Sequence, residues 1–200
     1  MKNSTWSGRF KKGLDKQVLE FSESVSIDHL LFDSDIRVSL AHAEMLGECK
    51  IITKTEAKKL CKGLQQVKKK YYEGKLSLSI KHEDVHMNIE QALTKEVGEL
   101  GKKIHMGRSR NDLVATDFRL YLRDCADLIL AKIKDIRYAV ALVAKANFDV
   151  IFPGYTHMQL AQPVSFGHHL LAWHEMFARD EQRILPVSYT HLRAHETNSN

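Results

Sequence analysis

The sequence predicts an all-α protein, and three observations lead to that fold class. Only three of the 200 residues are prolines, at positions 153, 163 and 186, so little interrupts a helix between Asp33 and Phe152. Apolar residues recur at steps of three and four over long stretches, which is the period of an amphipathic helix. The alternation that marks a half-buried strand is scarce. We therefore expect helices throughout, some of them long.

The first half of the chain predicts three helices of ordinary length. Residues 34–50 carry apolar side chains at helical spacing. Thr53 and Glu56 then form the capping-box pattern that begins a second helix, which continues to a glycine at position 74. The short connection predicts a helical hairpin. A third helix is expected over residues 84–97, with a glycine placed to end it.

The longest periodic segment runs from about Asn111 to Phe148. Its apolar residues alternate steps of four and three, as in the seam of a helical bundle: Leu122, Ala126, Ile129, Ile133, Ile136, Val140 and Val143. A helix of this length would extend over roughly 50 Å at ~1.5 Å per residue. A small monomer cannot bury it, so we expect partner helices from other subunits. A last helix should begin after Pro163.

These elements group into an N-terminal helical domain and the start of a second domain. We expect the first to span residues 1–110 and the second, the first long helices of a truncated central helical bundle, to span residues 111–185. The helical pattern ends at Pro186. Residues 187–197 resemble the in-frame translation of a sequencing-library transposase adapter. We therefore expect residues 186–200 to be a non-native tail.

Composition excludes several classes of protein. With 44% hydrophobic and 28% charged residues, the chain is unlike disordered or collagen-like sequences. The net charge of +5 is spread along the chain, which favours a small anionic ligand at least as much as nucleic acid. Cys49, Cys61 and Cys125 lie too far apart for a disulfide framework or a metal knuckle. No apolar run approaches the ~20 residues of a membrane helix, so we expect a cytoplasmic protein.

Residues 82–86 fit the H-E-x-x-H pattern of zinc proteases, which needs both histidines one turn apart on a regular helix. Asp84 is typical of a helix start, so His82 should lie before the helix and His86 in its first turn. We therefore expect no metal here. Two readings stay open: Glu83 and Asp84 complement the helix dipole, or Asp84 and His86 point into an active site.

Three further polar segments could bind a ligand or carry chemistry. Residues 107–112 precede the longest helix, where free backbone N–H groups and two arginines favour an anion, although Asn111 could instead be the helix cap. Residues 152–159 form a turn between long helices, and rigidly held loops often carry catalytic groups, although a lone histidine there is also compatible with packing. Residues 21–28 form a serine-rich turn for which helix capping is the simplest role.

Taken together, these segments resemble the argininosuccinate lyase family of the fumarase and aspartase superfamily. The matching segments occur in the family's order over residues 6–185: Trp6–Phe10, Phe21–Asp28, Asp35–His42, Glu83–Asn88, Gly107–Asp112 and Gly154–Pro163. The chain differs from the family's usual residues at four positions, which are Ser7, Val38, Met106 and Leu113.

The resemblance implies a helical homotetramer, with active sites shared between subunits, that eliminates fumarate from argininosuccinate and leaves arginine. It implies substrate contacts from Ser24, Arg110, Asn111 and Thr156, an acid or base role for His157, and supporting roles for Asp84 and His86. No cofactor, metal, nucleic acid or membrane partner is implied. The family's mobile serine loop, which carries the other half of the acid–base pair, does not occur in this sequence. We therefore expect the chain by itself to be inactive.

The residue types fit what this elimination requires. Removing a carbon-bound proton next to a carboxylate builds up negative charge, which calls for cations and hydrogen-bond donors around the substrate. The leaving nitrogen must gain a proton, so an acid and a base are both needed. Three rivals remain: a delta-crystallin-like structural protein of the same fold, another lyase of the superfamily such as adenylosuccinate lyase, and a basic helical module for nucleic acid. The last is disfavoured because the lysines are dispersed and lack interleaved aromatic residues.

Overall fold

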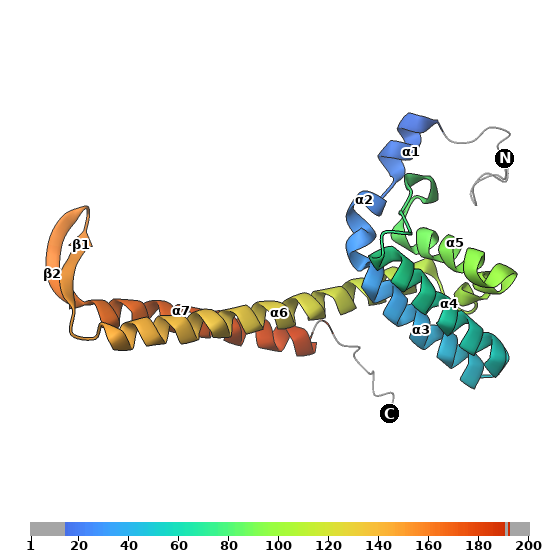
Figure 1. The fold of residues 1–200 in the computed structure, drawn as a ribbon. Coiled ribbons are helices and arrows are strands. Elements are labelled where there is room, and N and C mark those ends of the chain that lie inside the picture. The colour runs from blue at the N-terminus through green and yellow to red at the C-terminus, as the bar shows by residue number, and fades with distance from the viewer. Residues whose placement is uncertain (1–14, 191, 193–200) are drawn as a thin grey trace, which may run out of the picture. The chain divides into compact units, whose positions relative to one another are not determined.

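The computed structural model describes residues 15–190 and residue 192, and most of these residues lie in helices (Figure 1). The predicted helical fold class is confirmed, with one two-stranded exception. The chain divides into two compact units, Met1–Phe118 and Arg119–Asn200. The Trp6–Phe10 motif and much of the expected tail lie outside the described residues. No helix of the described part is long and apolar enough to cross a membrane.

The first unit consists of short and medium helices. The α-helices are α1 (Lys16–Ser22), α2 (Val25–Asp28), α3 (Phe32–Glu48), α4 (Lys54–Tyr72) and α5 (Val85–Val97), with 3₁₀ helices η1 (His29–Leu31), η2 (Ile80–His82) and η3 (Gly98–His105). Helices α3, α4 and α5 match the three predicted helices closely. Helices α1 and α2 were not predicted, because the serine-rich segment was interpreted as a turn.

Local capping chemistry sets the helix boundaries in the first unit. The Thr53 and Glu56 side chains each accept the other's backbone N–H, so the predicted capping box begins α4. The Asp84 carboxylate accepts the Met87 N–H at 2.7 Å and begins α5. Gly98, whose φ of +74° suits glycine, ends that helix. These cap residues explain why the start and end of α5 were predicted correctly.

The core of the first unit lies between α3, α4 and α5. Its largest deeply buried apolar residues are Phe32, Ile36, Leu46, Leu60, Leu64, Val67, Val85 and Leu93. Full burial of one such side chain stabilises the fold by ~1.5–3 kcal/mol. A Cβ at Gly63 of α4 would lie only 2.7 Å from Leu93 Cδ1 of α5, so these two helices pack closely. The first turn of α5 therefore projects from a rigid scaffold.

The longest helix, α6 (Arg110–Ala146), begins in the first unit and continues into the second. In the second unit it lies beside α7 (Phe166–Thr190), to which Arg137 is paired through Glu181. Helix α7 extends one turn past Pro186, where the sequence predicted the helical pattern to end. The prediction was wrong because proline removes one backbone donor but its fixed φ of about −65° is compatible with a helix.

The segment predicted as a turn between two long helices is a β-hairpin. Strand β1 (Ile151–Thr156) pairs antiparallel with β2 (Gln159–Ser165), from Ile151 opposite Ser165 to Thr156 opposite Gln159. His157 and Met158 form its two-residue loop with φ values of +49° and +63°. Such loops usually contain Asn-Gly or Asp-Gly, which adopt positive φ easily. Because His-Met stands in place of these dipeptides, the hairpin could not be predicted from its loop.

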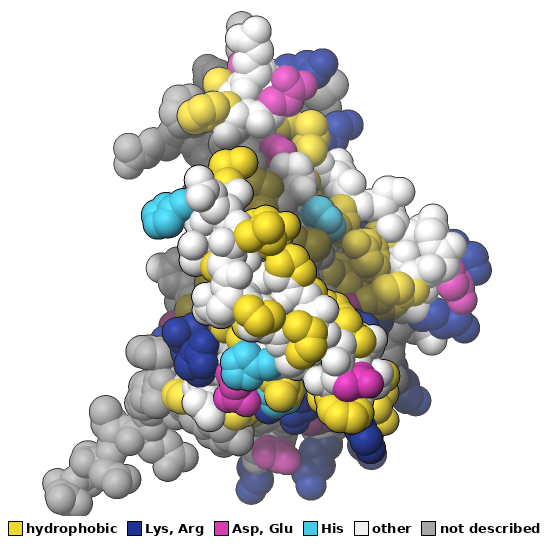
Figure 2. Space-filling view, turned by 90° about the vertical axis from the view of Figure 1, so that its left-hand side faces the viewer, with side chains coloured by type: hydrophobic (Ala, Val, Ile, Leu, Met, Phe, Trp, Pro, Cys, Tyr) yellow, Lys and Arg dark blue, Asp and Glu magenta, His cyan; other side chains and the backbone are white. Residues whose placement is uncertain are grey.

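The apolar seam predicted along α6 is largely uncovered in the second unit. Only Leu130, Ile133 and Ala144 are buried among its apolar residues beyond Phe118. Ile129 and Ile136 are 49% and 43% exposed. The covering of the seam by further helices therefore stays a prediction. Hydrophobic side chains are also exposed at the hairpin, the end of the second unit that faces the viewer in Figure 2.

Candidate functional site

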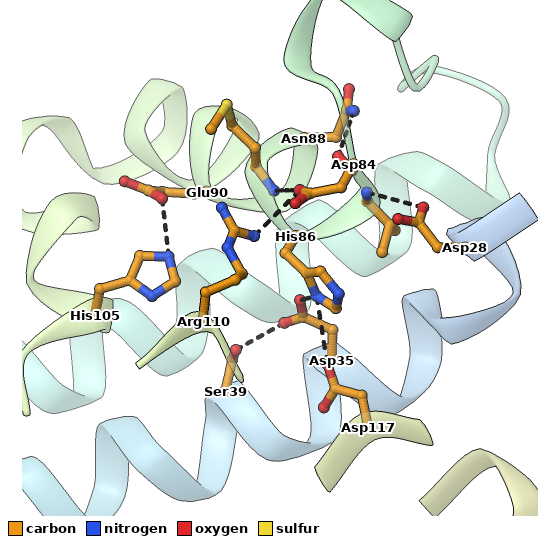
Figure 3. Close-up of polar contacts among 12 residues, drawn as sticks. Asp28, Asp35, Ser39, Asp84, His86, Asn88, Glu90, His105, Arg110 and Asp117 are labelled. Atoms are coloured by element: carbon orange, nitrogen blue, oxygen red, sulfur yellow. Dashed lines mark hydrogen bonds and ion pairs between the residues drawn. The ribbon is translucent and has the colours of Figure 1, made fainter. Parts of the chain in front are cut away.

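The first turns of α5 and α6 meet at an ion pair between two predicted site residues. Arg110 Nη1 lies 3.1 Å from Asp84 Oδ1, the same oxygen that caps α5 (Figure 3). Both side chains are partly exposed, at 33% for Arg110 and 22% for Asp84. The guanidinium is therefore accessible to an anionic ligand while the carboxylate holds it in place.

Ser24 is attached to the same helix start through Asp28. The Ser24 hydroxyl donates to Asp28 Oδ2 at 2.6 Å. Asp28 Oδ1 accepts the Val85 N–H at 3.0 Å (Figure 3). The Ser24 N–H also donates to the Glu83 carbonyl at 2.8 Å. A serine hydroxyl has one proton to donate. Ser24 must therefore rotate away from Asp28 before its hydroxyl can donate to a substrate.

Ser109, rather than Asn111, caps α6. The Ser109 hydroxyl accepts the Asn111 N–H at 3.2 Å, and the Asp112 carboxylate accepts the Ser109 N–H at 3.0 Å. This reciprocal pattern is similar to a capping box, with the serine accepting from the second rather than the third residue of the helix. The alternative in which Asn111 is the cap is therefore wrong. Asn111 lies exposed on the first helical turn, next to Arg110.

His86 faces the interior of the first unit instead of the Asp84–Arg110 pair. Its Nδ1 lies 2.6 Å from Asp35 Oδ2 on α3 and 3.4 Å from Asp117 Oδ2 on α6 (Figure 3). Ser39 donates to the other oxygen of Asp35 at 2.8 Å. The side chains of His86, Asp35 and Asp117 are 3%, 2% and 0% exposed. Because carboxylates only accept, the short contact places the imidazole proton on Nδ1.

The buried charges shift one another's pKa values. Burial, followed by the nearby charge of Asp35, raises the pKa of Asp117 to about 8, although His86 and Arg108 oppose the shift. Burial lowers the pKa of His86, but the hydrogen bond and charge of Asp35 outweigh it and leave that pKa above its ordinary value. The raised pKa of Asp117 favours its neutral form at neutral pH, and the raised pKa of His86 favours the imidazolium more than in a free histidine.

Asp35, His86 and Asp117 also form a set that could hold a metal ion, with ligand atoms within 4.8 Å of one another. The donors are two carboxylates and one imidazole, which suit a divalent cation. However, the 2.6 Å contact is a hydrogen bond, and the charge of Arg108 already acts on both carboxylates. The zinc-protease arrangement is not formed, because His82 lies in η2 and His86 in α5.

The remaining predicted residues, Thr156 and His157, lie in the second unit at the tip of the hairpin. Both are exposed, and His157 occupies the first position of the positive-φ loop. Non-glycine residues in this region store backbone strain of order 1–2 kcal/mol, and such strain often occurs at functional positions. The predicted site residues thus fall into two groups: Ser24, Asp84, His86, Arg110 and Asn111 in the first unit, and Thr156 and His157 in the second.

Sequence reasoning gave no role to Asp28, Asp35, Ser39 or Asp117. Asp35 and Ser39 belong to a matched motif, but their contact with His86 depends on the packing of three helices. One signal was available: a charged residue beside the apolar stripe of a helix, such as Asp117 four residues after the buried Leu113, requires a buried partner.

Comparison with known proteins shows the family of this chain. A family model described as Lyase matches residues 8–195. The chain is 48% identical over 179 residues to the argininosuccinate lyase of Nitrosococcus oceani, covering 90% of this chain and 38% of that protein. It is 47% identical over 182 residues to the argininosuccinate lyase of Chromohalobacter salexigens, covering 91% and 39%. The chain thus spans about two fifths of the length of these curated relatives.

Two solved structures share the fold. An EDDS lyase in complex with formate matches with a TM-score of 0.68 and 29% identity, over 85% of this chain and 33% of that chain. A fumarate lyase:delta crystallin from Brucella melitensis matches with a TM-score of 0.68 and 18% identity, over 86% and 45%, which is a likeness of fold alone. Because the family model covers nearly the whole chain, this protein belongs to the lyase family that the model describes.

Proposed function

We propose that this chain is part of an argininosuccinate lyase, which eliminates fumarate from argininosuccinate and leaves arginine, in arginine biosynthesis or the urea cycle. The observation that carries the proposal is the meeting of two motifs at the Asp84–Arg110 pair, which sets a partly exposed guanidinium at a helix N-terminus. That arrangement suits an anionic substrate. The 47–48% identity to curated argininosuccinate lyases supports argininosuccinate as that anion.

The residues of the first unit would bind the substrate's succinyl group. Arg110 supplies a charge-assisted hydrogen bond, Asn111 adds an amide donor on the same helical turn, and Ser24 adds a hydroxyl once it leaves Asp28. Such donors would stabilise the negative charge that builds up as the carbon-bound proton is removed. Asp84 holds Arg110, and His86 supports the start of α5 from the core side.

The residues of the second unit would take part in proton transfer. A base removes the proton from the carbon next to a carboxylate, the electron pair forms the double bond of fumarate, and the carbon–nitrogen bond breaks. The departing guanidinium nitrogen then takes a proton from an acid. His157 is one member of this pair, and Thr156 binds a substrate carboxylate. The other member is a serine on a loop that this sequence does not contain, so the chain alone is inactive.

The complete enzyme is proposed to be a cytoplasmic homotetramer that needs no cofactor or metal. The uncovered apolar residues of α6 support an assembly with further helices, because exposing large apolar surfaces to water is unfavourable. Active sites shared between subunits would then combine the two groups of residues. The likeness to a delta crystallin concerns the fold and does not favour a structural role.

A lyase chimera tests this function: residues 1–185 of this chain followed by the downstream part of a curated argininosuccinate lyase. We expect fumarate release from argininosuccinate and none from adenylosuccinate, measured by ultraviolet absorbance. The 200-residue chain alone should release none. A chimera that sediments as a folded tetramer but is silent on argininosuccinate would contradict the proposal. Activity on adenylosuccinate would instead favour the other lyase of the superfamily.

A further inference from the structure

The first unit contains a cluster of four buried polar residues and the half-buried Arg108. Within the described residues, the cluster makes no hydrogen bond or ion pair with the proposed substrate-binding residues. We propose that Asp35, Ser39, His86, Arg108 and Asp117 form a positioning device that fixes the first turn of α6, and so places the Arg110 guanidinium and Asn111 for the substrate anion. The substrate in this inference rests on the proposed function. The other part of the inference, that the cluster fixes the start of α6, does not depend on the proposed function.

A continuous series of contacts joins the start of α6 to two other helices. Arg108 Nη2 lies 3.4 Å from the Ser39 hydroxyl of α3, and Ser39 donates to Asp35 at 2.8 Å. Asp35 then binds His86 of α5, which lies 3.4 Å from Asp117 of α6. One end of the series of contacts is therefore Arg108, in the loop before α6, and the other end is Asp117, in α6 itself.

The cluster and the ligand-facing residues share the same backbone segments. His86 follows Asp84 by two residues in the first turn of α5. Arg108 precedes Arg110 by two residues, on the other side of the cap Ser109. Asp117 follows Arg110 by seven residues, which brings it to the same face two helical turns later. A shift of the cluster would therefore move the Asp84–Arg110 pair.

The size of the space at the cluster excludes direct contact with substrate. The cavity lined by Asp35, Ser39, His86 and Arg108 has a volume of only about 10 Å³. That is about the space of one water molecule and too small for a carboxylate ligand. The cluster must therefore act through the residues attached to it.

Stability alone does not account for these residues. Replacing buried ion pairs with apolar side chains of similar volume is often neutral or stabilising. In addition, both carboxylate oxygens of Asp117, and Nε and Nη1 of Arg108, make no hydrogen bond within the described residues. A group of charges that is costly to bury and incompletely paired fits a role in fixing geometry better than one in holding the core together.

The test compares Ser39→Ala and Arg108→Lys with the parent lyase chimera. Ser39→Ala removes the link between Arg108 and Asp35 without changing any charge, so it should fold even if Arg108→Lys does not. We expect a ~10-fold or greater loss of kcat/KM, mostly through KM, because small displacements of positioning residues have effects of this size. The matched control is Asp127→Asn, an exposed carboxylate on α6, which should behave as the parent.

Amide hydrogen exchange supplies a readout that does not depend on activity. Both variants should speed exchange at residues 109–113 while the amides of α4 keep the parent's protection. Unchanged exchange at 109–113 together with an unchanged KM would overturn the inference, and so would a uniform loss of protection, which indicates a merely structural role. If the parent chimera releases no fumarate, the proposed function fails, and the exchange pattern alone still decides whether the cluster controls the start of α6.

Discussion

The two groups of predicted site residues differ in how firmly the chain holds them. In the first unit, Arg110 is fixed by Asp84, and the helix starts around it are capped and attached to a buried core. In the second unit, His157 lies on an exposed two-residue loop with positive φ. Under the proposed function, the arginine of the anion site is held in place within this chain, whereas the proposed proton-transfer residue lies on an exposed loop.

The largest effect is expected at His157, the exposed residue of the second unit. In the lyase chimera, His157→Asn should reduce turnover by roughly 10²–10⁴, the usual contribution of one general acid or base. The helical fold should be unchanged, because the side chain is exposed. The measurement is steady-state fumarate release, with circular dichroism as the control for folding. Turnover within a few-fold of the parent would exclude His157 from the acid–base pair.

Two leucine-to-alanine substitutions, one in each unit, should destabilise the two units unequally. Leu60 is 0% exposed in the first unit, so Leu60→Ala should lower its free energy of unfolding by ~2–5 kcal/mol. Leu128 of α6 is 62% exposed, so Leu128→Ala in the 200-residue chain should cost much less. Hydrogen exchange of the chain, resolved by segment, measures both. Equal losses would show that the second unit has a core comparable to that of the first.

The buried cluster predicts a pH dependence confined to the first unit. Because the folded-state pKa of Asp117, about 8, exceeds its ordinary value of 3.8, the folded state binds more protons between these limits. Stability should therefore fall as the pH rises from about 4 to about 8. The raised pKa of His86 acts in the same direction above its ordinary value of 6.5. Asp117→Asn, which keeps a neutral group there, should flatten the decline.

Urea unfolding midpoints of the lyase chimera at about pH 5 and about pH 8 test this dependence. The matched control is Asp127→Asn, which replaces an exposed carboxylate on the same helix and should keep the parent's decline. A decline of the same size in Asp117→Asn would mean that Asp117 is already ionised across this range.

A smaller effect is expected at the preorganised anion site. Arg110→Ala and Ser24→Ala should each weaken argininosuccinate binding by ~1.5–3 kcal/mol, because each removes a hydrogen bond to a charged group. Arg110→Ala should have the larger effect, since Ser24 already donates to Asp28 in the free protein. Steady-state kinetics of the lyase chimera give KM and kcat for each variant. Parent-like KM and kcat in both variants would place the anion site elsewhere.

The sequence predicted those parts of the molecule that depend on local chemistry. The capping residues Thr53 and Asp84 act within one turn of their own positions, so the starts of α4 and α5 followed from spacing alone. The contact between Asp35 and His86 joins residues 51 positions apart, and no periodicity reports it. The hairpin was missed for a third reason, because its loop lacks the glycine or asparagine that signals a positive-φ turn.

That loop supplies the smallest prediction. Met158 has a φ of +63°, a conformation that costs non-glycine residues ~1–2 kcal/mol, so Met158→Gly should stabilise the hairpin by about 1 kcal/mol. The matched control is Gly154→Ala, whose new Cβ would lie 2.9 Å from the Gln162 carbonyl oxygen and should destabilise the same hairpin. Exchange at the β1 and β2 amides of the lyase chimera measures both changes.

If Met158→Gly slows exchange but lowers turnover as much as His157→Asn does, the strain in the loop holds His157 for catalysis. If turnover stays at the parent's level, as we expect, the imidazole is oriented by the helices that cover the hairpin in the assembled enzyme, and the strain follows from the tight turn alone.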